Sequence, residues 1–140
     1  MWKAFDEMER LGWIGPARPR MVSVQAEGCC PIPRAFAAGA DVSLRFPDAH
    51  TYASGLRVPK AYADYLILSI LRASNGEAVT VTDDEMRRGV AEMAGSEGLF
   101  AAPEGGAAWI AVGKLLEDGK LDLHERVVVF DTGTGYKYVV

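Results

Sequence analysis

The sequence has few of the residues that build metal or redox sites. It contains two cysteines and two histidines among 140 residues. Cys29 and Cys30 are adjacent, so they cannot form a Cys-x-x-Cys pair; a strained vicinal disulfide is one alternative, and two reduced, partly buried thiols are the favoured one. His50 and His124 lie far apart, without acidic or thiol neighbours at ligand spacing. We therefore expect no metal site.

The chain also lacks a basic excess and a long apolar run. Lysine and arginine number 15 against 19 aspartates and glutamates, a net charge of −4 that argues against general nucleic-acid binding. No apolar run approaches the roughly 18 residues that a membrane span needs. Met1 is followed at once by an amphipathic, acidic helix pattern and not by a signal peptide. We expect a cytoplasmic protein that binds neither nucleic acid nor membrane.

What is present is an alternation of helical and strand-like segments. The strands are predicted at residues 21–25, 78–81 and 127–130, and the helices at 2–11, 31–38, 59–74, 83–94 and 104–118. Pro59 is expected at the first position of its helix, and Gly95 is expected to close the helix that begins after the capping box of residues 82–85. The alternation predicts one α/β domain with three αβα layers around a parallel sheet.

A candidate ligand site follows the third predicted strand. Residues 127–130 are apolar and largely β-branched, which is typical of a fully buried strand. Residues 131–135 read Asp-Thr-Gly-Thr-Gly and end it with turn formers and hydroxyls. Ligands of open parallel sheets bind beyond the carboxyl ends of the strands. The segment is either such a site or simply a glycine-rich turn that closes a core strand.

Two features suggest that the chain is part of a larger α/β unit. Three strands are few for a parallel sheet, which needs helices on both faces and protected edges. In addition, no capping residue precedes the helix that starts at Trp2. We expect the sheet to be incomplete by itself.

Four short blocks carry a resemblance to a known family. They are residues 25–31 (QAEGCCP), 53–59 (ASGLRVP), 97–105 (EGLFAAPEG) and 131–137 (DTGTGYK). In this order they resemble the carboxyl-terminal third of the threonine synthase family, over residues 1–140. The resemblance implies a partial fold-type-II pyridoxal-phosphate domain, related to the β-subunit of tryptophan synthase.

The resemblance also implies a chemistry. Threonine synthases are pyridoxal-phosphate lyases of threonine biosynthesis that convert O-phosphohomoserine and water to threonine and phosphate. The Schiff-base lysine of the family lies upstream of the matched region, and the glycine loop that binds the cofactor phosphate would lie just before Met1. No catalytic residue is therefore assigned to this chain. We expect it to be inactive alone, to work with the missing amino-terminal part, and to form a homo-oligomer.

Cofactor-binding residues are carried over position by position. The hydroxyl of Thr132 is implied to face the pyridine nitrogen, where a neutral donor suits an unprotonated ring. Asp131 should point away, because side chains alternate along a strand. The lesser candidates are open between a structural and an active-site role. They are Glu27 and Gly28, at the end of the first strand, and Ser54 and Gly55, in a loop that the family places near the cofactor.

Other residues have more ordinary interpretations. Arg57 could meet a substrate phosphate, but a surface salt bridge is favoured, and Glu104 suits a helix start whatever its function. Two alternatives to threonine synthase stay open. One is a serine/threonine dehydratase- or cysteine synthase-like fragment, and the other is a non-catalytic small-molecule-binding module.

Overall fold

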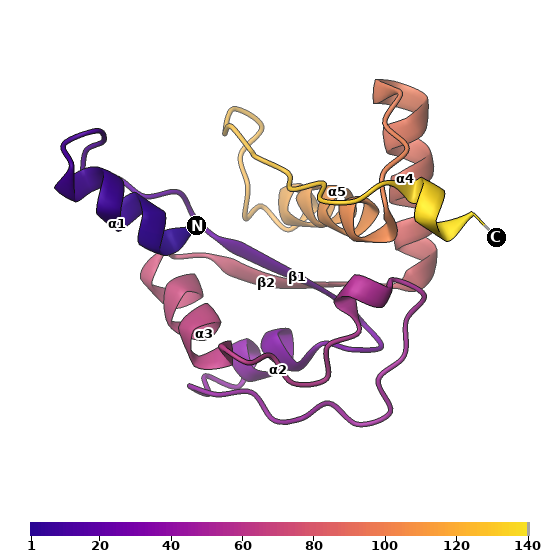
Figure 1. Ribbon diagram of the computed structural model, residues 1–140, viewed down its shortest axis with the longest axis horizontal. Coiled ribbons are helices and arrows are strands. Elements are labelled where there is room, and N and C mark those ends of the chain that lie inside the picture. Colours follow the sequence, from indigo (N-terminus) through magenta and orange to yellow (C-terminus); the bar gives the residue numbers. More distant parts are fainter. Residues whose placement is uncertain (140) are drawn as a thin grey trace.

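The computed structural model describes residues 1–139, which form a mixed α/β structure around a short sheet (Figure 1). In chain order the elements are α1 (Trp2–Arg10), β1 (Val22–Ala26), α2 (Pro31–Ala37), η1 (Ser54–Leu56), α3 (Asp64–Ala73), β2 (Glu77–Val81), α4 (Asp83–Glu97), α5 (Pro103–Glu117) and η2 (Gly135–Tyr138), where η denotes a 3₁₀ helix. No helix in this part of the chain is both long and apolar enough to cross a membrane.

The sheet has the predicted parallel direction. β1 pairs with β2 from Val22 opposite Glu77 to Ala26 opposite Val81. Figure 1 shows α2 and α3 on one face of the pair and α4 and α5 on the other. This arrangement confirms the three-layer αβα architecture expected from the alternation of helices and strands.

Each face of the sheet carries its own apolar cluster. On one side Ala26 and Val81 pack with Met86 of α4 and with Ala107, Ile110 and Ala111 of α5. On the other side Ile32 and Ala35 of α2 meet Leu68 and Leu71 of α3. Both faces of the sheet are therefore covered, as a parallel pair requires.

The third predicted strand, at residues 127–130, is wrong for this structure. These residues form no strand, and Val127, Val128 and Phe130 are 45%, 78% and 55% exposed. A strand needs a neighbour to satisfy its backbone groups, and among the described residues β1 and β2 pair only with each other. The apolar run instead passes beside α5 without a ladder (Figure 1).

The segment before this run is tied to the start of β1 across almost the whole chain. Both carboxylate oxygens of Glu125 accept hydrogen bonds of 2.7 Å from the Arg20 guanidinium. Arg20 also donates to the carbonyl of Lys120 at 2.8 Å. One terminal nitrogen of Arg20 serves both Glu125 oxygens, and the other terminal nitrogen serves the Lys120 carbonyl, so the guanidinium joins two points of this segment by charge-assisted bonds. The guanidinium therefore fixes where the chain leaves α5.

Helix ends were predicted with mixed success. Thr82 forms the expected capping box with Glu85, confirming the start of α4. Gly95 does not close that helix; Gly98 does so, with φ at +69°, where glycine is favoured. Pro59 does not begin α3; its carbonyl accepts from the Phe46 N–H at 2.8 Å, and residues 59–63 are not helical. The helix starts at Asp64 instead.

Asp64 binds a distant loop to the start of α3. It is 4% exposed and accepts from the backbone N–H of Ser43 at 2.6 Å and from its hydroxyl at 2.8 Å. The ammonium of Lys60 lies 2.5 Å from the same oxygen. Hydrogen bonds from Lys60 and then Ser43 hold the pKa of this carboxyl well below its usual range.

We expect this carboxylate to make folding stability depend on acid pH. A carboxyl group with a lowered folded pKa stabilises the fold above its unfolded pKa of about 4 and loses that contribution as pH falls further. Wild-type protein should therefore lose stability more steeply than Asp64→Asn between neutral pH and about pH 3. Urea unfolding at several pH values measures this. Asp41→Asn, at a 99% exposed partner of Arg72, is the control and should keep the wild-type slope.

Candidate functional site

The carboxyl edge of the sheet is where the predicted site residues of the first strand lie. The N–H of Glu27 donates to the carbonyl of Val81 at 2.9 Å, which extends the β1–β2 pairing by one residue. Gly28 lies directly against His50, whose N–H donates to the Gly28 carbonyl at 3.0 Å, and a side chain at position 28 would overlap that histidine. Gly28 is thus required for a close approach, while the Glu27 side chain is exposed.

The segment after His50 is fixed to the start of α4. The hydroxyl of Thr51 donates to Asp83 at 2.5 Å, and the N–H of Tyr52 donates to the other carboxylate oxygen at 3.0 Å. The guanidinium of Arg87 lies 4.1 Å from the centre of the Tyr52 ring, and burial raises the pKa of the Tyr52 phenol. These contacts place η1, with Ser54 and Gly55, next to the carboxyl end of β2.

The turn that carries Thr132 lies against the amino-terminal end of α5. Ala101 and Thr134 form an isolated antiparallel bridge. The N–H of Ala102 donates to the carbonyl of Gly133 at 3.0 Å, and the N–H of Gly135 donates to the carbonyl of Phe100 at 2.8 Å. The turn is therefore docked by its backbone, although the run before it is not a strand.

Side chains of this turn point in different directions. The carboxylate of Asp131 packs against Gly105, so closely that a side chain there would overlap it. Thr132 is exposed, and no hydrogen bond engages its hydroxyl within residues 1–139. The hydroxyl of Thr134 accepts from the N–H of Tyr136 and caps η2. Within the described residues, Thr132 is thus the hydroxyl of the turn that has no hydrogen-bond partner in the chain.

Glu104 joins two of these segments. One of its carboxylate oxygens accepts from the N–H of Gly55 and from the hydroxyl of Tyr138, each at 2.8 Å. The Tyr138 oxygen also lies 2.8 Å from the hydroxyl of Ser54. The structure therefore brings the predicted residues Ser54 and Gly55 to Tyr138 of η2, six positions after Thr132. Sequence reasoning did not find Tyr138, for which no local pattern gives a signal.

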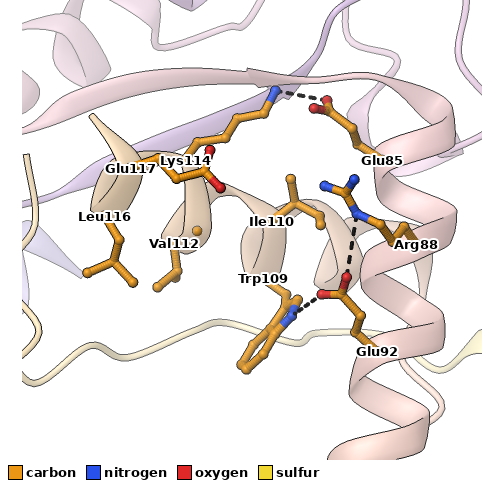
Figure 2. A pocket seen from close by; sticks show the side chains of 10 residues that line it. Glu85, Arg88, Glu92, Trp109, Ile110, Val112, Lys114, Leu116 and Glu117 are labelled. Carbon is orange, nitrogen blue, oxygen red and sulfur yellow. Dashed lines mark hydrogen bonds and ion pairs between the residues drawn. The ribbon is translucent and has the colours of Figure 1, made fainter. Parts of the chain in front are cut away.

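A separate groove lies between α4 and α5, with Trp109, Val112 and Leu116 along one wall (Figure 2). Apart from Glu117, its charged groups are paired with one another. Lys114 lies 2.8 Å from Glu85, Arg88 lies 3.4 Å from Glu92, and the indole N–H of Trp109 donates to Glu92 at 2.9 Å. Ligand sites need convergent polar groups that are free to bind. The groove has no such set among its lining residues.

The cysteines and acidic residues do not gather into a metal centre in the part of the chain described. No group of three or more histidine, cysteine, aspartate or glutamate side chains there could hold an ion. Cys29 and Cys30 are both buried and free. Burial raises the pKa of the Cys29 thiol, which disfavours the reactive thiolate.

Comparison with known proteins places the chain in a family. Residues 1–133 match the sequence family described as pyridoxal-phosphate dependent enzyme. The chain belongs to this family. The family's cofactor, pyridoxal phosphate, is the one that the resemblance implied.

Curated relatives agree with the predicted resemblance. The chain is 34% identical to the threonine synthase of Methanocaldococcus jannaschii, over 98% of this chain and 34% of that enzyme. It is 33% identical to the threonine synthase of Methanosarcina acetivorans, over 95% of this chain and 33% of that enzyme. The chain thus spans about a third of the length of these relatives.

Solved structures confirm the fold class. Maize serine racemase superposes with a TM-score of 0.54 at 20% identity, over 66% of this chain and 27% of that one. The threonine deaminase of T.th. superposes with a TM-score of 0.55 at 17% identity, over 85% of this chain and 50% of that one. At these identities the likeness concerns the fold alone.

The chemistry of the exposed hydroxyls is compatible with a pyridoxal cofactor. Thr132 offers a neutral hydroxyl, and the neighbouring carboxylate of Asp131 is turned toward α5. A neutral partner for the ring nitrogen is compatible with this family's cofactor, whereas a carboxylate would keep that nitrogen protonated.

Proposed function

We propose that residues 1–140 are a single domain equivalent to the carboxyl-terminal third of a threonine synthase. In the complete enzyme, O-phosphohomoserine and water would give threonine and phosphate. The observation that carries this proposal is the 34% identity to a threonine synthase along 98% of the chain. The docked turn of residues 131–135 supports it, because that turn holds an unengaged hydroxyl at Thr132.

The chain's own residues would bind and orient; they would not cleave bonds. Pyridoxal phosphate, when bound, supplies the electron sink for the chemistry. Thr132 would donate its hydroxyl hydrogen to the ring nitrogen. Glu27 and Gly28, at the carboxyl end of β1, would border the site, and Gly55 would bring the backbone close. The lysine and the phosphate-binding loop would come from the amino-terminal part of the enzyme.

This assignment predicts that the isolated chain forms no specific covalent adduct with pyridoxal phosphate. None of its five lysines, at positions 3, 60, 114, 120 and 137, stands in the family's lysine motif. Lys60 and Lys114 are moreover committed to Asp64 and Glu85. Borohydride trapping followed by peptide mass spectrometry should find only scattered, substoichiometric labelling. Stoichiometric labelling of a single lysine would refute the mapping of the motifs.

The function itself is tested with a chimera. The matched carboxyl-terminal third of the Methanocaldococcus jannaschii threonine synthase is replaced by this chain. We expect the chimera to bind pyridoxal phosphate and to release phosphate from O-phosphohomoserine. The same chimera carrying Gly106→Val is the control, because this change disrupts the packing between α4 and α5. Any phosphate release that persists in it does not need this domain. The alternative outcome is a chimera that folds and binds the cofactor, releases no phosphate, and dehydrates threonine or serine. That result would favour the dehydratase alternative.

A further inference from the structure

Three segments that lie far apart in the sequence meet at the carboxylate of Glu104. Glu104 is the second residue of α5, Gly55 belongs to η1, and Tyr138 ends η2. The same oxygen of Glu104 accepts from the Gly55 N–H and from the Tyr138 hydroxyl. We call these three residues together with Ser54 the Glu104 clasp.

The clasp is built for close contact. A side chain at position 55 would place its Cβ 2.7 Å from the Glu104 oxygen, so the carboxylate would have to shift away from its present contact with the Gly55 N–H. The ring of Tyr138 lies edge-on to that of Tyr52, with centroids 6.3 Å apart. At the start of a helix the negative charge of Glu104 is also favoured by the helix dipole. Each of these features holds the carboxylate in one place.

The clasp also fixes the direction of a hydrogen bond at Ser54. A carboxylate only accepts, so Tyr138 must donate its single hydroxyl hydrogen to Glu104. The contact of 2.8 Å between Tyr138 and Ser54 then requires Ser54 to be the donor. With its own hydrogen committed, Ser54 can only accept from any other partner. Its oxygen is exposed and would accept from an ammonium or hydroxyl group, but it could not donate to a phosphate.

We propose that Glu104 is a positioning residue, which holds the Ser54–Gly55 turn against the carboxyl-terminal segment and presents Ser54 as a hydrogen-bond acceptor for the ligand. The part that concerns the ligand rests on the proposed function. The part that concerns the position of the two segments does not, because it needs no cofactor.

The first arm of the test measures amide hydrogen exchange in the full 140-residue chain. Glu104→Ala should speed exchange of the Gly55 amide by about tenfold or more, the effect of one lost charge-assisted bond. Glu104→Gln keeps an acceptor oxygen and should restore most of the protection. Tyr138→Phe should leave Gly55 protected, because Gly55 bonds to Glu104 directly. Glu117→Ala, at the other end of α5, is the matched control and should change neither segment.

The second arm uses the chimera and a titration with pyridoxal phosphate. Ser54→Ala removes the acceptor and should weaken binding by about threefold or more, the effect of one neutral hydrogen bond. Tyr138→Phe leaves the Ser54 oxygen able to accept and should bind pyridoxal phosphate about as tightly as the wild-type chimera. Unchanged Gly55 exchange in Glu104→Ala would overturn the positioning role. Unchanged affinity in Ser54→Ala would overturn the acceptor role of Ser54. A wild-type chimera that binds no cofactor would refute the proposed function, and the exchange arm would still decide whether Glu104 positions the segments.

Discussion

Replacing Gly106 by valine is expected to cost about 3 kcal/mol of folding stability or more. A Cβ at this position would lie 2.6 Å from the Met86 carbonyl oxygen and 2.9 Å from the Val90 backbone nitrogen, both on α4. Backbone atoms cannot turn aside as a flexible side chain can, so the two helices would have to separate. The apolar cluster that α4 and α5 share with the sheet would open with them. Urea unfolding followed by circular dichroism measures the loss.

Gly113 on the same helix provides the matched control. Nothing lies within 4 Å of a Cβ added there. Gly113→Ala should therefore leave the fold intact and stabilise it by roughly 0.5–1 kcal/mol, because alanine favours helix more than glycine does. If Gly106→Val were as stable as the wild type, the close crossing of α4 and α5 would be wrong.

Thr132→Val is expected to raise the dissociation constant for pyridoxal phosphate roughly 5- to 150-fold in the chimera, equivalent to about 1–3 kcal/mol. The variant keeps the shape of threonine but removes the hydroxyl that would meet the ring nitrogen, so a buried acceptor would be left without a donor. Thr132→Ser should bind nearly as well as the wild type. Thr132→Asp should protonate the ring and change its absorption spectrum. Equilibrium titration followed by absorbance measures all three.

Thr134→Val is the comparison that separates a binding role from a local structural one. Its hydroxyl caps η2 inside the chain, so its loss should loosen residues 135–138 with a smaller effect on the cofactor. A large loss of affinity in Thr134→Val beside a silent Thr132→Val would show that the cofactor meets the other hydroxyl.

Local signals in the sequence predicted the parts of the fold that depend on neighbouring residues. The capping box at Thr82 is complete within four positions, so the start of α4 could be predicted. The parallel pairing of β1 with β2 followed from the helices between them. Residues 127–130 were misjudged because an apolar, β-branched run shows a preference for strand but not whether a partner strand is present.

The candidate site could be predicted only in part, because local sequence signals do not show which distant segments meet. The resemblance singled out Ser54, Gly55 and Thr132 as residues near a cofactor. It could not show that Glu104 connects the first two with Tyr138, because that connection depends on packing between segments 34 and 49 positions apart. A glutamate in the first turn of a helix is already explained by the helix dipole. The sequence therefore offers no reason to expect that Glu104 also contacts Gly55 and Tyr138.

The bond from Arg20 to Glu125 has a consequence for the order of folding. It spans 105 positions, whereas α4 and α5 follow one another in the chain. Contacts between distant positions carry a larger loop-closure cost and form later than local ones. During synthesis, α4 and α5 can pack together before Glu125, the partner of Arg20, has been translated. The turn with Thr132 lies beyond Glu125, so it is translated after both helices and after the partner of Arg20.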